Sequence, residues 1–284
     1  MTSSTAIFPH DSTGCRFFRA LKVDLRRSVL SRRFLLTVVL MLAWMLVNSA
    51  TNIFIYGFLY GFGIPYTFNA ALVGEFGLGM IVLAIATVPY STSYQADQEC
   101  GFDRHAIERV GFTSYSVSRV ISVALSAFLA FVAAAGLFLL ALSLSGAPHN
   151  TIPGNGEYLN GDYLDLVITV GPWCYYLVRF TISGLTCAMA AVFALYICAL
   201  IPNGYVALLS PLIGYYAYIP VINIIMKLTG GSEIIRLFVL NYIVTFQVNS
   251  NNGFSFLWAV IYQLTVIVLC GRGFCRRLRK EQGL

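Results

Sequence analysis

The stretch that decides the fold is RFFRALKVDLRRSVLSRR (residues 16–33) followed by FLLTVVLMLAWMLVNSATNIFIY (residues 34–56). The first part contains seven arginines and lysines, whereas the second contains no charged residue. An apolar run of about 20 residues is long enough to cross a bilayer as a helix. Residues 34–56 are therefore predicted to form a membrane span that is preceded by a basic segment.

Further apolar runs follow along the chain of 284 residues, of which 58% are hydrophobic and only 11% are charged. This is too few polar residues to cover a water-soluble core of that size. The sequence therefore predicts an all-α membrane protein whose transmembrane domain covers residues 34–271. Its expected spans are 34–56, 70–91, 119–145, 173–200, 205–226 and 254–271.

The basic residues predict how these spans are oriented. Of the 18 lysines and arginines, 15 lie before the first run, between the second and third runs, or after the last. With six spans, the three clusters fall on one face, as the positive-inside rule requires for the cytoplasm. We expect a multi-pass plasma-membrane protein, of the bacterial inner (cytoplasmic) membrane type, with both termini and the basic tail 272–284 in the cytoplasm. The net charge of +6 is thus a topology signal, and no basic stripe predicts nucleic-acid binding.

The cytoplasmic N-terminal segment 1–33 has no short apolar stretch ending in a small-residue cleavage site, so the first span is expected to be retained. Within it, Phe17, Leu21, Leu25 and Val29 repeat every four residues among basic side chains. This pattern predicts an amphipathic helix over residues 14–31 that lies in the headgroup plane. The alternative is a basic leader that only fixes the orientation.

A second non-spanning element is expected between the fifth and sixth spans. The apolar run 234–248 is about 15 residues long, which is short for a span. A seventh span there would also move the basic tail to the outer side. We therefore predict a re-entrant or interfacial helix on the outer face.

No catalytic or metal-binding motif occurs in the sequence. The histidines lie in separate segments, the seven cysteines are scattered without a Cys-x-x-Cys pair, and there is no phosphate-binding glycine loop. We expect neither an enzyme nor a metal site. Glu75 and Arg179 are the ionisable residues within the predicted spans; they either reach the headgroups, pair with each other, or line a substrate path.

The loop 94–118 between the second and third spans carries both signs of charge interspersed with apolar side chains. Residues 102–109 are predicted to form a short helix with an apolar edge and a charged edge, preceded by Gly101 and ended by Gly111. A solvated loop needs no such edge. A helix that docks onto a soluble partner does, because it buries apolar side chains within a rim of charge.

Here the chain resembles the permeases of ABC-2 type transporters. Glu99, Gly101 and Phe102 before the short helix, and Ser118 and Arg119 opening a long span, match that family's pattern, although Ser116 stands in place of its usual proline. The layout is also similar: an interfacial elbow helix, six spans, a cytoplasmic coupling helix between spans two and three, and re-entrant outer helices between spans five and six.

This resemblance implies a permease dimer, whose second subunit is identical or homologous, bound to two ABC ATPase subunits. ATP and Mg²⁺ would be held by those partners, with no cofactor in this chain. The implied docking surface comprises Glu99, Gly101, Phe102, Arg104, His105, Glu108 and Arg109. The expected function is export of an amphipathic or hydrophobic substrate, such as a peptide, a lipid-like molecule or a drug.

Four aromatic residues at the outer end of the first span and just beyond it are candidates for the substrate path together with Glu75 and Arg179: Phe54, Tyr56, Phe58 and Tyr60. The alternative for the aromatics is an interfacial belt. A transporter or channel that works without an ATPase remains the second hypothesis. Its polar pathway would draw on scattered residues: Asn48, Ser126, Asn223 and Gln263. A structural or signalling membrane protein, or an enzyme without a recognised motif, is the third.

Overall fold

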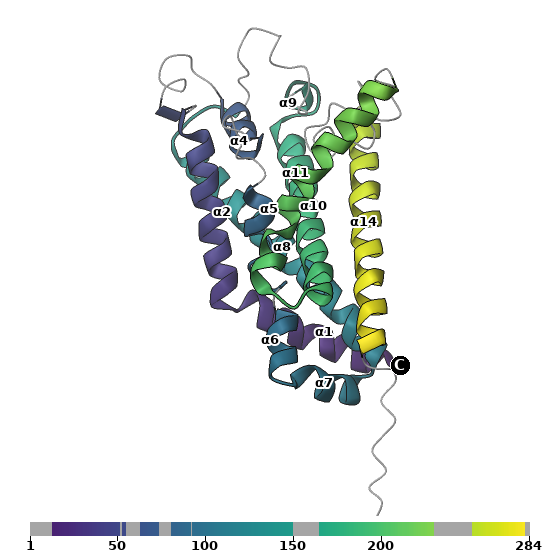
Figure 1. Ribbon diagram of the computed structural model, residues 1–284. Coiled ribbons are helices and arrows are strands. Elements are labelled where there is room, and N and C mark those ends of the chain that lie inside the picture. The colour runs from purple at the N-terminus through teal and green to yellow at the C-terminus, as the bar shows by residue number, and fades with distance from the viewer. Residues whose placement is uncertain are drawn as a thin grey trace, which may run out of the picture.

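The computed structural model describes residues 13–51, 53–54, 63–73, 81–91, 93–149, 165–229 and 252–281, and every regular element among them is helical (Figure 1). The helices are α1 (Thr13–Val29), α2 (Arg32–Thr51), α4 (Ile64–Val73), α5 (Ile81–Ile85), α6 (Ser93–Glu99), α7 (Phe102–Val110), α8 (Phe112–Leu144), α9 (Asp165–Thr169), α10 (Pro172–Leu200), α11 (Gly204–Leu228) and α14 (Asn252–Glu281).

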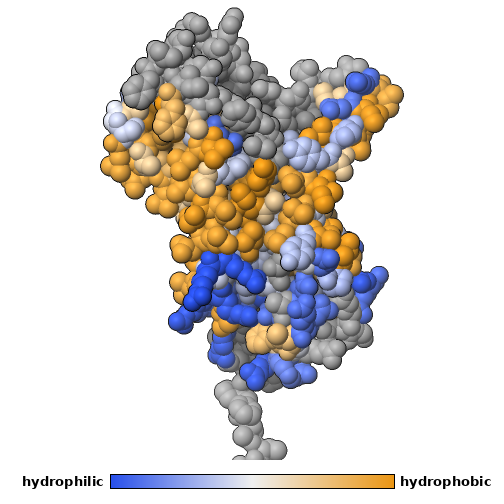
Figure 2. All heavy atoms as spheres, turned by 60° about the vertical axis from the view of Figure 1, so that its left-hand side comes forward, coloured by the Kyte–Doolittle hydropathy of each residue, from blue (hydrophilic) through white to orange (hydrophobic). Residues whose placement is uncertain are grey.

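Within the described part of the chain, five helical segments are long and apolar enough to cross a membrane, as in a multi-pass membrane protein. They are Arg32–Ala50, Phe112–Leu144, Pro172–Leu200, Gly204–Leu228 and Gly253–Lys280. Figure 2 shows the matching surface: on the face in view, a broad apolar band crosses the middle of the molecule, and hydrophilic side chains gather below it. The prediction of an all-α protein with several apolar spans is confirmed at this level.

Helices α8 and α10 form the centre of the bundle. They pack against each other, α2 lies against α8, and α14 lies against both, while α11 packs on α10. Small residues allow the close approach that membrane helices need. At Gly184 of α10, an added Cβ would lie 2.7 Å from the ring of Phe128 on α8, so no larger residue fits without moving that ring.

Several helices begin or end at residues other than the predicted span boundaries. α10 and α11 start and end within two residues of the predictions, and α2 begins two residues early. α8 begins at Phe112 rather than at residue 119, because the polar residues before Arg119 continue the helix and several of them are buried. α14 runs on through the basic tail to Glu281, since Phe274 and Leu278 are buried there. Hydropathy marks where lipid contact ends, not where a helix ends.

The prediction of one helical span over residues 70–91 is wrong at its inner end. α4 (Ile64–Val73) includes the first residues of this span and α5 covers Ile81–Ile85, but residues 86–91 form turns. Two backbone bonds there, Thr87 N–H to Ala84 O and Val88 N–H to Ile85 O, are the short i to i−3 type at 3.1 Å. Pro89 has no N–H to donate, which opposes a continued helix.

One end of the bundle, which we call the basal end, carries α1, α6, α7 and the last turns of α14 (Figure 1). Helices are present where the elbow helix 14–31 and the loop helix 102–109 were predicted, as α1 and α7. The opposite, distal end carries α4 and α9 (Figure 1). The predicted outer helix 234–248 lies outside the described residues.

Candidate functional site

The basal helix α7 is set apart from its neighbours by glycines. Gly101 precedes it in the left-handed conformation (φ 68°), and Gly111, with φ 92°, separates it from α8. Residues other than glycine rarely adopt such backbone angles. The two glycines therefore separate α7 from α6 and α8, and Gly111 lies just after α7, where the sequence predicted that the helix stops.

The outer surface of α7 exposes the residues expected to dock a partner. Phe102 is 46% exposed, which is high for a phenylalanine at the polar end of the molecule. Glu99, His105, Glu108 and Arg109 are exposed as well, and His105 Nδ1 lies 3.9 Å from Glu108 Oε2. The side chain of Arg104 lies outside the described residues. An apolar side chain is thus surrounded by charges of both signs.

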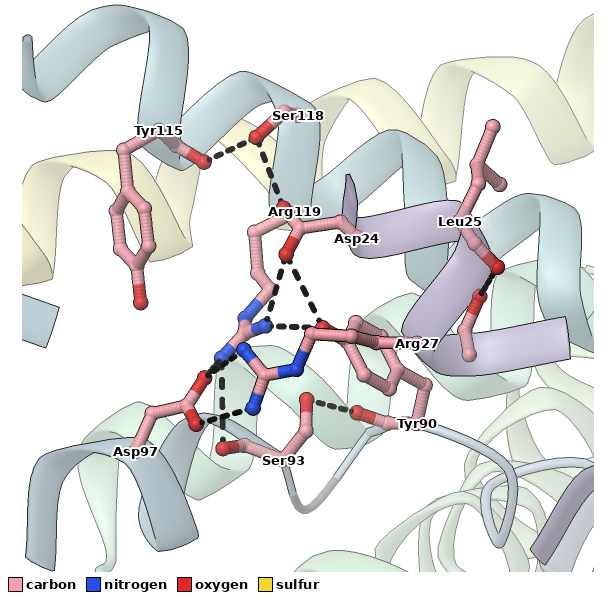
Figure 3. A network of polar contacts seen from close by, with 10 residues as sticks. Asp24, Leu25, Arg27, Tyr90, Ser93, Asp97, Tyr115, Ser118 and Arg119 are labelled. Carbon is pink, nitrogen blue, oxygen red and sulfur yellow. Dashed lines mark hydrogen bonds and ion pairs between the residues drawn. The ribbon is translucent and has the colours of Figure 1, made fainter. Parts of the chain in front are cut away.

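Beneath α7, a network of polar contacts joins four segments of the chain, and Arg119 on α8 is its centre (Figure 3). Its side chain is fully buried. One guanidinium nitrogen, Nη1, donates to Asp24 of α1 at 3.4 Å and to the hydroxyl of Tyr90. The other, Nη2, donates to Asp97 of α6 and to the carbonyl oxygen of Ser93 at 3.4 Å.

The carboxylate of Asp24 is also held by two hydroxyl donors. Tyr90 donates to its Oδ1 at 3.1 Å, and Ser118 of α8 donates to its Oδ2 at 3.1 Å. Asp24 is only 6% exposed although it belongs to the basic helix α1. A buried carboxylate with these partners is anchored, so α1 is fixed to α8 and to the turn that contains Tyr90.

Arg27 of α1 extends the network to α7. Its two terminal nitrogens donate to the carboxylate of Asp97 at 2.9 and 3.5 Å, and its guanidinium lies 5.0 Å from the ring centre of Phe102. Burial is the largest single influence on Arg27 and lowers its pKa. The hydrogen bond to Asp97, together with the electrostatic interactions with Tyr90 and Asp97, outweighs burial and raises the pKa of Arg27 above its ordinary value. Asp97 therefore accepts from two arginines, one on α1 and one on α8.

The network contains two guanidinium groups and two carboxylates, so its formal charges balance. The Nε atom of Arg119 has no hydrogen-bond partner among the described residues, but the guanidinium lies 4.8 Å from the ring of Tyr90 and 5.7 Å from that of Tyr115. The aromatic faces stabilise the cation electrostatically. Removing one partner of such a buried pair is costly, because the remaining charge has lost its counter-ion.

The end of α14 also contacts this region. Phe274 packs edge-to-face on Tyr94 of α6 with ring centres 5.3 Å apart, and Arg279 lies 5.6 Å from the ring of Phe112 at the start of α8. Arg277 donates to the carbonyl oxygen of Ala199 at 3.4 Å. The segment predicted as a basic cytoplasmic tail is thus helical as far as Glu281, and its residues 274–279 contact α6, α8 and α10.

Of the residues predicted for a substrate path, the structure describes Phe54 and Arg179, and neither of them belongs to this site. Phe54 is 75% exposed, and Tyr56, Phe58, Tyr60 and Glu75 lie outside the described residues. Arg179 is buried towards the distal end of α10, where it donates to Asn69 of α4 at 2.6 Å rather than extending to headgroups.

The polar residues considered for an ATPase-independent pathway do not line one channel among the described residues. Asn48 donates to the carbonyl of Ala71 at 3.4 Å, Ser126 bonds within its own helix, and Gln263 bonds to Thr186 at 2.8 Å. Asn223 is exposed on α11. Each therefore has a local partner or faces outward.

Sequence reasoning found Arg119 through the family pattern but missed Asp24, Tyr90 and Asp97 as its partners. One signal was available: Asp24 is the only acidic residue in the helix 13–29. A single carboxylate among basic residues in an interfacial helix indicates that the carboxylate forms a specific ion pair, and here it pairs with Arg119. The described residues contain no group of three metal-binding side chains.

Comparisons with known proteins found no match for this chain among protein-family models, curated proteins or solved structures.

Proposed function

We propose that this chain is the permease subunit of an ATP-driven exporter of the ABC-2 type. Two ATPase subunits dock on the basal surface of α6 and α7, and a second permease subunit, identical or homologous, completes the core. ATP and Mg²⁺ are bound by the ATPases. The cargo is amphipathic or hydrophobic, and it moves from the basal to the distal side of a bacterial cytoplasmic membrane.

The observation that carries this proposal is that α7 offers both an exposed docking surface and a rigid connection inward. Phe102 contributes one part of its ring to the surface, while Arg27 contacts that ring and pairs with Asp97. Asp97 in turn pairs with Arg119 in the long helix α8. A partner that moves α7 would therefore act on Arg27 of α1 through the ring of Phe102, and Asp97 of α6 connects Arg27 to the buried Arg119 of α8.

Chemical energy enters this scheme as differential binding. ATP favours the closed ATPase dimer, and the closed dimer binds one arrangement of the permease helices more tightly than another. The permease needs no nucleotide site of its own for this. The permease needs a docking element, and it needs contacts that transmit the displacement of that element to the spanning helices.

The test is co-purification of an ATPase with the full-length chain from membranes of its native cells. We expect ATP hydrolysis in the purified complex, and we expect its loss in the double variant Phe102→Asp/Arg109→Glu. The matched control is Ile201→Asp/Lys280→Glu, which likewise replaces one apolar and one basic residue by Asp and Glu. Ile201, in the turn before α11, is 48% exposed, and Lys280 is exposed on α14. This control should retain the ATPase.

Equal ATPase recovery from both double variants would contradict docking on α7. A second measurement addresses the competing transporter hypothesis. Purified chain alone, reconstituted in liposomes with an amphipathic fluorescent dye, should give no flux without the ATPase, and flux under those conditions would overturn the exporter proposal.

A further inference from the structure

An apolar cavity of about 210 Å³ lies between α5, α10, α11 and α14, and none of its lining residues belongs to the basal network. Leu83, Ala190 and Tyr215 form its buried floor. Phe193 of α10, Tyr218 of α11 and Tyr262 of α14 are among its walls. A hydrogen bond joins the hydroxyls of Tyr218 and Tyr262 to each other, so the walls present mainly carbon to the space between them.

The cavity lies at the middle of the spanning helices. Its α11 residues begin at Pro211 and end at Tyr218 in a helix that runs from Gly204 to Leu228. At a rise of about 1.5 Å per residue they lie roughly 10 to 21 Å from the basal start of α11. That depth corresponds to the hydrocarbon region of a bilayer whose apolar core is about 30 Å thick.

The sequence of α11 explains why the space is hollow. Pro211 lies inside the helix, where it removes one backbone hydrogen bond and bends the axis. Three residues later, Gly214 contributes no side chain to the wall, and an added Cβ there would lie 3.4 Å from the ring of Phe193. A bend and a missing side chain on the same face leave a gap that α10 and α14 do not fill.

The helices α11 and α14 that line the cavity also carry exposed apolar surface close in sequence to the lining residues. Ile213 and Tyr216 on α11, and Ile261 and Leu264 on α14, are all between 46% and 59% exposed. In a membrane these side chains face lipid, so the cavity exchanges its contents with the bilayer rather than with water. A dry apolar cavity of about 150 Å³ is already large enough to bind benzene in a protein core.

We propose that this cavity is a binding site for the apolar chain or ring of an amphipathic molecule that enters from the lipid phase. The exported cargo is one source of such a molecule and a bilayer lipid is the other. In naming the cargo, the inference rests on the proposed exporter function; the binding itself does not.

The experiment uses the full chain in phosphatidylcholine nanodiscs, without ATPase, and a hexadecanoic acid that carries a diazirine on its chain. After photolysis, mass spectrometry maps the labelled residues. We expect label on α10, α11 and α14 around the cavity, and at least a fivefold decrease when excess unlabelled hexadecanoic acid is present.

Two variants that fill the cavity from different helices, Gly214→Leu on α11 and Ala190→Phe on α10, should each lower the labelling at least fivefold. Gly136→Leu on α8 is the matched control, because an added Cβ at Gly136 meets no atom within 4 Å, and it should label like the unmodified chain. Thermal unfolding in detergent identifies any variant that fails to fold. Unchanged labelling in a folded cavity-filling variant would overturn the proposal.

A phosphatidylcholine that carries the same diazirine distinguishes the two sources. Labelling of the cavity by the fatty acid but not by the phospholipid supports a cargo site. If the fatty acid and the phospholipid label the cavity equally, and unlabelled hexadecanoic acid does not reduce the labelling, the cavity is a lipid site. That result would overturn its assignment to cargo. Because no ATPase is present, loss of docking on α7 would leave these results unaffected.

Discussion

Arg119 stands at the boundary where the third predicted span begins, yet its side chain has no exposed surface and has carboxylates on both sides. Its charge is tolerated at that position because Asp24 and Asp97 approach it from helices that are distant in the sequence. A change at either aspartate leaves a buried cation with half of its counter-charge. The stability of the basal end therefore depends on single carboxylates.

We predict that Asp24→Asn lowers the free energy of unfolding by about 3 kcal/mol, since it removes one partner of a buried ion pair. Thermal unfolding of the detergent-solubilised protein, followed by tryptophan fluorescence, measures the effect. The control is Glu108→Gln, an identical chemical change at an exposed carboxylate, which should leave the melting temperature unchanged. Equal melting of the two variants would contradict the assigned role of Asp24.

A second prediction at this scale concerns the buried pair of Gln263 and Thr186 within the spans. Gln263 donates to Thr186, while its own Oε1 has no hydrogen-bond partner among the described residues. Thr186→Val leaves the amide without its acceptor and should cost about 1 kcal/mol in thermal unfolding. Gln263→Leu removes the whole amide and should cost less; the opposite order of the two melting temperatures would show that the amide is satisfied elsewhere.

At the scale of elements, the direction of α7 depends on the two glycines that flank it. Gly101 has φ 68° and ψ 8°, a left-handed conformation that asparagine tolerates. Gly111 has φ 92° and ψ 146°, close to a region that is essentially restricted to glycine. The two positions therefore differ in what they accept.

We predict that Gly111→Asn destabilises the protein by about 1 to 3 kcal/mol, the cost of holding a side chain in that strained backbone region. Gly101→Asn should lower the melting temperature by much less. Neither added Cβ meets an atom within 4 Å, so the comparison isolates backbone strain from crowding. A larger loss at Gly101 would mean that α6 and α7 are joined differently.

For the whole molecule, the clustering of basic segments at one end of the bundle leads to a test of orientation. Cys100 is exposed at the basal end, between α6 and α7, and Trp173 is 69% exposed at the distal start of α10. Two chains are compared, one in which Cys100 is the single cysteine and one in which Trp173→Cys supplies the single cysteine. A membrane-impermeant maleimide added to intact cells should label the Trp173→Cys chain and should not label the Cys100 chain. Inverted membrane vesicles should give the reverse pattern.

Labelling of Cys100 from outside intact cells would place α7 away from the cytoplasm. The predicted topology and the docking proposal would then both be wrong. Labelling of Trp173→Cys from outside together with protection of Cys100 would agree with the positive-inside arrangement.

Sequence alone determined that this protein is helical and apolar, where its long helices lie, and that a short helix between Gly101 and Gly111 precedes α8. These features are local: they depend on runs of apolar residues, on charge and on glycine, all of which are readable within one window of sequence. The exact ends of the helices were less predictable, because α8 and α14 continue as helices through polar and basic residues.

Only the tertiary structure decided that Asp24, Tyr90 and Asp97 surround Arg119, and that Pro211 and Gly214 leave a cavity between α10 and α14. The interacting side chains in the network are 22 to 95 residues apart in the sequence. Such pairings depend on how helices pack, and one sequence window contains no information on which distant helix supplies the partner. The residues were visible in the sequence, but their proximity was not.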